Sequence, residues 1–196
     1  MEKLFITAVL FALGIWIWNE YFRAIPHLEQ AGVLKNFKVE TIEPHQAEYR
    51  VIAKQYYSPE RRMLHPASPL VESFNDLAYV SNIDLLLVEP NISNAELKQV
   101  QLEQEKRCFT IQAQENSHPD IDKLRTNVHN FSVIAANNNV AKQIRRLKAN
   151  QQILVTGDWV KVSALKRNED YYVGFRSPQV AQCQLFRVNN IVNLKP

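Results

Sequence analysis

The two cysteines, Cys108 and Cys183, carry the most reactive side chains of this chain. Cys108 follows Arg107, and a neighbouring cation can lower the pKa of a thiol and produce a nucleophilic thiolate. A small apolar strand residue is the simpler interpretation of Cys108. If the domain is exported to an oxidising compartment, Cys108 and Cys183 could instead pair as a disulfide. Two cysteines cannot form a four-cysteine zinc site.

The histidines, carboxylates and glycines lack the spacing of known catalytic and metal sites. The five histidines form neither an HxH nor an HExxH pattern, and His118 with Asp120 and Asp122 is better explained as a solvated loop. Glu169 and Asp170 fall in an expected turn. The four glycines are scattered, which argues against a P-loop, a dinucleotide-binding loop and a nucleophile elbow. We therefore predict no catalytic residue, no metal site and no cofactor.

A basic helix is the best candidate for a binding surface. Val140, Ile144 and Leu147 recur at helical spacing behind Asn139, a candidate N-cap. The rest of this segment carries cations and no acid: Lys142, Arg145, Arg146 and Lys148. With Trp159 they could bind single-stranded nucleic acid, or they could face anionic lipid headgroups. A solvated helix face with the aromatic residue in the core is the simplest interpretation, and a net charge of +3 does not by itself indicate nucleic acid.

The positioning elements begin with an apolar run from Leu4 to Trp18, in which only Thr7 is polar. About 15 residues is short of the roughly 20 that span a bilayer, but Trp16, Trp18 and Tyr21 suit a membrane interface. We predict a single-pass transmembrane anchor over residues 1–23. A cleaved signal peptide is less favoured because no small-x-small site follows, and a core helix is less favoured because the run is apolar on every face.

The orientation of this anchor has two opposing indications. Lys and Arg residues are more numerous after the run than before it, which favours a cytoplasmic domain. A short charged start followed directly by the apolar run is typical of a signal anchor and favours export. We expect the exported orientation, in a bacterial inner membrane with the domain on the periplasmic side.

Residues 24–36 read as a juxtamembrane connector, and residues 37–196 as a β-rich globular domain. Ser93 and Glu96 form a capping box that begins a short helix, and a hairpin follows over 100–111. The stretch 77–88 is either a helix or a buried strand. Further strands are expected at 37–42, 48–57, 130–136, 153–156, 159–165, 171–175 and 183–188, with turns at 157–158, 166–170 and 189–190.

This pattern predicts a mainly β fold with minor α, of the α+β class. We expect an N-terminal transmembrane helix followed by a small, partly open OB-like β-barrel. Gly157 fits a tight turn or a bulge at which the sheet curls.

Three stretches resemble a family of uncharacterised bacterial proteins with a single N-terminal transmembrane segment and a small β-rich domain. They are SNAELKQVQLEQEKRCF, NFSVIAANNNVAKQIRRLKANQQILVTGDWVKV and VAQCQLFRVNNI. The matching positions are Ser93, Val100, Leu102, Gln104, Arg107, Phe109, Asn130, Leu147, Gly157 and Cys183. Ser132 and Ala135 stand where the family often has a histidine and a proline, so no role is carried over for that histidine. The resemblance implies a membrane-anchored domain and no reaction.

We therefore expect a non-enzymatic domain that binds another protein within a bacterial envelope complex. The anchor would raise the encounter rate with membrane partners. An OB-like domain that binds oligosaccharide or single-stranded nucleic acid through the basic helix and Trp159 is the alternative. A hydrolase that uses Cys108 or converging histidines is the third interpretation.

Overall fold

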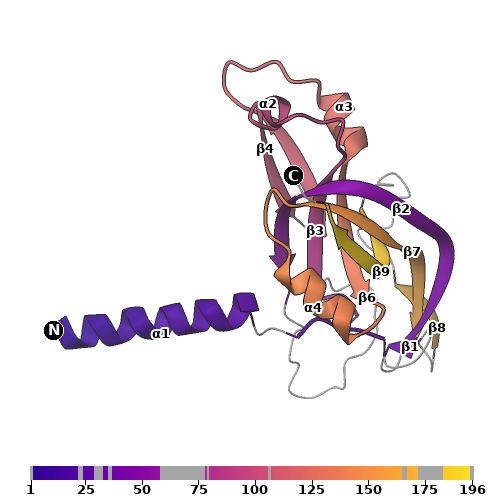
Figure 1. The fold of residues 1–196 in the computed structure, drawn as a ribbon, viewed down its shortest axis with the longest axis horizontal. Coiled ribbons are helices and arrows are strands. Elements are labelled where there is room, and N and C mark those ends of the chain that lie inside the picture. The colour runs from indigo at the N-terminus through magenta and orange to yellow at the C-terminus, as the bar shows by residue number, and fades with distance from the viewer. Residues whose placement is uncertain are drawn as a thin grey trace.

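The computed structural model describes residues 2–21, 24–28, 33–34, 37–57, 78, 80–105, 107–164, 167–171 and 183–194. Strands dominate and helices are few, which confirms a mainly β, α+β fold (Figure 1). The helices are α1 (Glu2–Tyr21), α2 (Asn94–Leu97), α3 (Ile121–Asn127) and α4 (Asn138–Arg146). The strands are β1 (Val33–Leu34), β2 (Phe37–Tyr56), β3 (Ile83–Val88), β4 (Val100–Glu105), β5 (Cys108–Ala113), β6 (Val128–Ala135), β7 (Gln152–Ala164), β8 (Arg167–Tyr171) and β9 (Cys183–Asn193).

Five strands pair in a closed circuit. The long strand β2 pairs with β7 along Phe37–Arg50 and with β3 along Arg50–Tyr56. From β3 the pairing continues through β6 and β9 and returns to β7. Only β6 and β9 pair in parallel; the other four pairings in the circuit are antiparallel. The two expected strands at 37–42 and 48–57 are thus one strand, which bends at a register shift between Thr41 and Glu43.

Strand β3 explains the ambiguous stretch at 77–88. All six of its residues are buried, because both faces of the strand are covered. Leu85 and Leu87 belong to the main core cluster, whereas Leu86 and Val88 belong to a second cluster under β4, β5 and α3. A strand buried on both faces has no alternating pattern, so periodicity could not separate it from a helix.

Helix α4 covers one end of the sheet, and α2 and α3 lie at the other end (Figure 1). Val140, Ala141 and Ile144 of α4 pack into the main core cluster. The N-cap is Asn137, whose side chain accepts hydrogen bonds from the backbone N–H groups of Asn139 and Val140. The prediction of Asn139 as the N-cap was therefore wrong by two residues, since three asparagines follow one another.

Gly157 lies at a bulge, as expected, with a register shift between Thr156 and Gly157 in the β7–β9 pairing. A Cβ at this position would overlap the carbonyl oxygen of Arg187 and the ring of Phe186. The predicted turn at 157–158 was wrong, because β7 continues through it. The turns predicted at 166–170 and 189–190 were also wrong: β8 occupies the first and β9 runs through the second. Most of the strand predicted at 171–175 lies outside the described residues.

Helix α1 extends away from the domain (Figure 1). Every side chain from Leu4 to Trp18 is exposed, so α1 is not a core helix. Apart from Ile42 and Val192, all exposed large hydrophobic side chains of the described residues lie on α1. In the part of the chain that the structure describes, no helix combines the length and hydropathy needed to cross a membrane.

Candidate functional site beneath the β4–β5 hairpin

The β4–β5 hairpin covers the outer face of β3 and β6. The hairpin contributes Val100, with Leu102, Phe109 and Ile111 at the margin, to the cluster that contains Leu86 and Val88. These inward residues alternate with polar residues along both strands, which is the pattern of a hairpin buried on one face. The hairpin therefore belongs to the fold of the domain and closes this face of the sheet.

Arg107 lies at the turn of this hairpin and is completely buried. Its backbone is left-handed, with φ of 64°, and the side chain reaches over β3. One guanidinium nitrogen (Nη1) pairs with Oδ1 of Asp84 at 2.8 Å, and Nη2 donates to the carbonyl of Ser81 at 2.9 Å. The ring of Tyr57 lies 3.6 Å from the guanidinium carbon, in cation–π geometry.

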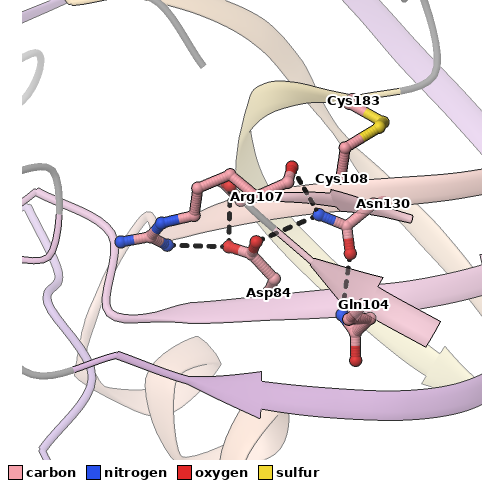
Figure 2. Close-up of a disulfide and its surroundings, with 7 residues drawn as sticks. Asp84, Gln104, Arg107, Cys108, Asn130 and Cys183 are labelled. Carbon is pink, nitrogen blue, oxygen red and sulfur yellow. Dashed lines mark hydrogen bonds and ion pairs between the residues drawn. A yellow bond between two sulfur atoms is a disulfide. The ribbon is translucent and has the colours of Figure 1, made fainter. Parts of the chain in front are cut away.

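Side chains on β3 and β6 complete this polar cluster (Figure 2). The carboxylate of Asp84 also accepts from the hydroxyl of Ser132 at 2.7 Å and from Nδ2 of Asn130 at 3.0 Å. Asn130 in turn donates to the carbonyl of Arg107, and its Oδ1 accepts from Gln104 at 2.7 Å. Ser132 lies opposite Asp84 in the β3–β6 pairing, so sheet register places these two side chains together.

Burial shifts the titration of this cluster. It raises the pKa of Asp84 above its ordinary value, and the Arg107 guanidinium and the hydrogen bonds from Ser132 and Asn130 oppose that rise. Burial, with the nearby Asp84 charge, raises the pKa of Tyr57 to about 12. Because Asp84 and Arg107 are both buried, removal of either charge leaves the other charge buried without a partner of opposite sign.

A disulfide lies beside this cluster. Cys108, directly after Arg107, is bonded to Cys183 at the start of β9, with a Cα–Cα distance of 5.2 Å (Figure 2). Asn130 lies opposite Cys183 in the β6–β9 pairing, so the disulfide and the ion pair hold the same turn. Both cysteines are bonded, so the interpretation of Cys108 as a nucleophilic thiolate is wrong for this structure.

The arrangement is suited to holding the hairpin in place. Asp84 and Arg107 have fully buried side chains. Both carboxylate oxygens of Asp84 and both terminal nitrogens of Arg107 have partners within the cluster, whereas Nε of Arg107 has none. A general acid or base must reach a substrate, and these groups are sealed from solvent. The sequence indicated Arg107 as the cation beside Cys108 and through the family resemblance, and Asn130 through the resemblance alone. Asp84 had no signal, because it lies inside an apolar run.

The structure separates the residues predicted as a binding surface. On α4, Lys142 and Arg146 are exposed and Arg145 is half-buried; Lys148, two residues after the helix, is exposed. Trp159 instead is half-buried and packs against the main core cluster, with its ring centroid 4.9 Å from those of Phe131 and Phe186. The indole of Trp159 therefore faces the core cluster, whereas the nucleic-acid alternative expected an exposed Trp159 beside the cations.

Sequence reasoning missed a group of titratable side chains inside the circuit of strands. Nε2 of His45 lies 2.8 Å from the hydroxyl of Tyr49, and Nε2 of His129 lies 2.9 Å from a carboxylate oxygen of Glu89. Burial, and then the charge of His129, lowers the pKa of His45; burial raises that of Tyr49. The alternation of His45, Ala47, Tyr49 and Val51 along one face of β2 was the available signal. Within the described ranges, no group of three or more histidine, cysteine or acidic side chains is placed to hold a metal ion.

Comparison with protein-family models, with curated proteins and with solved structures finds no match to this chain. The resemblance noted from the sequence stays a prediction.

Proposed function

We propose that this protein is a membrane-anchored interaction module without catalytic activity, part of a bacterial envelope complex. The observation that carries the anchoring is the exposure of α1. Its side chains from Leu4 to Trp18 are uncharged and exposed, while the rest of the described chain exposes only Ile42 and Val192 among its large hydrophobic residues. An apolar surface of this kind needs a cover, and lipid covers all faces of a helix at once.

The dimensions of α1 set how it would lie in lipid. Its 20 residues are about 30 Å long, close to the thickness of a bilayer core. The uncharged part from Leu4 to Trp18 is shorter, at about 22 Å. Local thinning of the bilayer and interfacial placement of Trp16 and Trp18 would make up the difference. Without these adjustments α1 lacks the length and hydropathy of a membrane-spanning helix, and with them we propose that it inserts as a single pass.

The disulfide supports placement of the domain on the periplasmic side of the inner membrane. Disulfides persist in oxidising compartments and are rare where thiols are kept reduced. The Cys108–Cys183 bond has a sequence separation of 75 residues and joins the β4–β5 hairpin to the start of β9. The signal-anchor order of the N-terminus agrees with this orientation.

We infer that the circuit of strands is OB-like. The strands follow the chain order β2, β3, β6, β7 and β9, with α4 between the third and fourth, and β9 is inserted between β6 and β7. OB domains bind oligonucleotides and oligosaccharides on the face of their second and third strands. Here β3 and β6 provide that face, and the β4–β5 hairpin covers it. The covered face and the inward Trp159 favour a protein partner over the alternative of an OB-type ligand.

Vesicle flotation of the purified full chain tests the anchoring. The wild type and an Ile42→Lys control should float with neutral phosphatidylcholine vesicles. Leu10→Lys/Leu13→Lys should stay at the bottom, because each charge in the bilayer centre costs about 3 kcal/mol. Flotation of this variant, or failure of the wild type to float, would overturn the anchoring.

A reporter enzyme that is active only outside the cytoplasm, fused after Pro196, tests the orientation. Activity is expected, and activity of a cytoplasm-specific reporter in its place would reverse the assignment. For the interaction role, a photo-crosslinking amino acid at Ile42 should capture a discrete protein in intact membranes, and one at Lys98 serves as the control. Turnover of an ester, phosphate or glycan panel by the purified chain would refute the non-catalytic proposal.

A further inference from the structure

We propose that the basic face of α4 binds the headgroups of anionic phospholipids and so holds the domain against the membrane surface. This inference rests on the proposed anchoring by α1. It adds a second membrane contact, in the domain itself, and names the chemistry of its partner.

The segment after α1 fixes α4 beside the anchor. Ile25 is buried in the same cluster as Ala141 and Ile144 of α4. The carbonyl of Pro26 accepts from the N–H of Ala135, and the N–H of Leu28 donates to the carbonyl of Ala135. Ala135 ends β6, two residues before the N-cap of α4. The structure also brings α1 and α4 into contact, and Figure 1 shows α1 leaving the domain beside α4.

The charge of α4 fits an anionic surface. Between residues 138 and 150 there are four cations and no acid. Within the described part of the chain, no ion pair or hydrogen bond engages the side chains of Lys142, Arg145, Arg146 or Lys148. Lys54 adds a further ammonium, which donates to the carbonyl of Arg145 at 3.0 Å. Cations next to a membrane-inserted helix are drawn to the negative potential of anionic lipids.

A cavity of about 170 Å³ beside Arg146 offers a place for one headgroup. It lies between α4 and β9 and is lined by Gln143, Arg146, Leu147, Gln151, Ile191 and Asn193. A guanidinium and neutral amides are donors to phosphate oxygens. Nucleic acid is less well matched, because Trp159 is half-buried and its ring packs on Phe131 and Phe186.

Site-resolved lysine acylation of the full chain in lipid nanodiscs tests the proposal. An uncharged acylating reagent is applied in phosphatidylcholine discs and in discs with added phosphatidylglycerol, and mass spectrometry follows each lysine. Lys142 and Lys148 should react about fivefold more slowly in the anionic discs, and the rate should recover in high salt. Lys98, exposed at the end of α2 on the far side of the domain, is the internal control and should not change.

Two variants and one ion complete the test. Arg145→Gln/Arg146→Gln should lose the lipid dependence at Lys148, whereas Arg125→Gln on α3 should retain it. Protection by inorganic phosphate in neutral discs would indicate a site for a small anion and overturn the lipid proposal. Equal rates at Lys142 and Lys148 in both discs would also overturn it. In that case normal flotation with neutral vesicles leaves the anchoring intact, whereas loss of flotation refutes the anchoring itself.

Discussion

The Asp84–Arg107 ion pair is expected to be a principal stabiliser of the hairpin against the sheet. Arg107→Met removes the guanidinium that pairs with Asp84. The buried Asp84 carboxylate then keeps its hydrogen bonds from Ser132 and Asn130 but has lost its charged partner. Breaking one side of a buried pair costs about 3–5 kcal/mol. For a domain of this size that corresponds to a fall in melting temperature of roughly 10 °C.

The double variant Asp84→Leu/Arg107→Met is the informative comparison. It removes both charges, together with the desolvation cost of each, and such replacements are often neutral or stabilising. Nε of Arg107 has no hydrogen-bond partner in the described structure, so methionine removes this unsatisfied group, while the Ser81 carbonyl and the Ser132 hydroxyl each lose one partner. The free energy of unfolding of the double variant should therefore lie closer to the wild type than that of Arg107→Met.

The pH dependence gives an independent check. Burial raises the pKa of Asp84, and without Arg107 one opposing effect is lost. A carboxyl whose pKa is raised in the folded state stabilises the fold below its unfolded pKa, and that stability is lost as the pH rises through the folded pKa. Arg107→Met should therefore be most destabilised at neutral pH and should recover toward pH 4, relative to the double variant.

Urea unfolding of the full chain in detergent micelles, followed by near-ultraviolet circular dichroism, measures these differences. The matched control is Arg125→Met, which removes an exposed pair with Asp122 and should cost no more than about 0.5 kcal/mol. If Arg107→Met costs as little as Arg125→Met, or if Asp84→Leu/Arg107→Met is less stable than Arg107→Met, the buried pair does not stabilise the hairpin.

Three further changes test other parts of the fold. Reduction of Cys108–Cys183, or its replacement by two serines, should lower the free energy of unfolding by roughly 4 kcal/mol, from the loop-closure entropy of a 75-residue separation; equal urea midpoints with and without reductant would contradict this. Gly157→Ala should lower the melting temperature by several degrees, because its Cβ overlaps the Arg187 carbonyl and the Phe186 ring, whereas Gly14→Ala, with nothing within 4 Å, should leave the domain unchanged. The pKa of His45 is lowered in the folded protein, so neutral His45 stabilises the fold above pH 6.5, and this stability is lost as the pH falls through the folded pKa. His45→Gln should therefore flatten the decrease in melting temperature between about pH 7 and 5. An unchanged slope would argue against this assignment.

Local sequence determined the features that depend on neighbouring residues. The capping box of Ser93 and Glu96 forms as predicted, because both partners lie within one helical turn. The apolar spacing of Val140, Ile144 and Leu147 predicted the buried face of α4, and Gly157 marked a bulge. The apolar run at Leu4 likewise predicted a segment that the domain does not bury.

Tertiary structure alone decided which distant groups meet. Asp84 lies in an apolar run and Arg107 in a polar turn, and only the pairing of β3 with β6 and the fold of the hairpin over them join these charges. The closed circuit likewise depends on β2 reaching both β3 and β7. The side of β7 on which Trp159 lies depends on the register shift at the bulge before it. The sequence specifies the spacing of side chains within one helix or strand. A buried charge or ring is stabilised by side chains from other elements, and which side chains these are is decided only when the chain has folded.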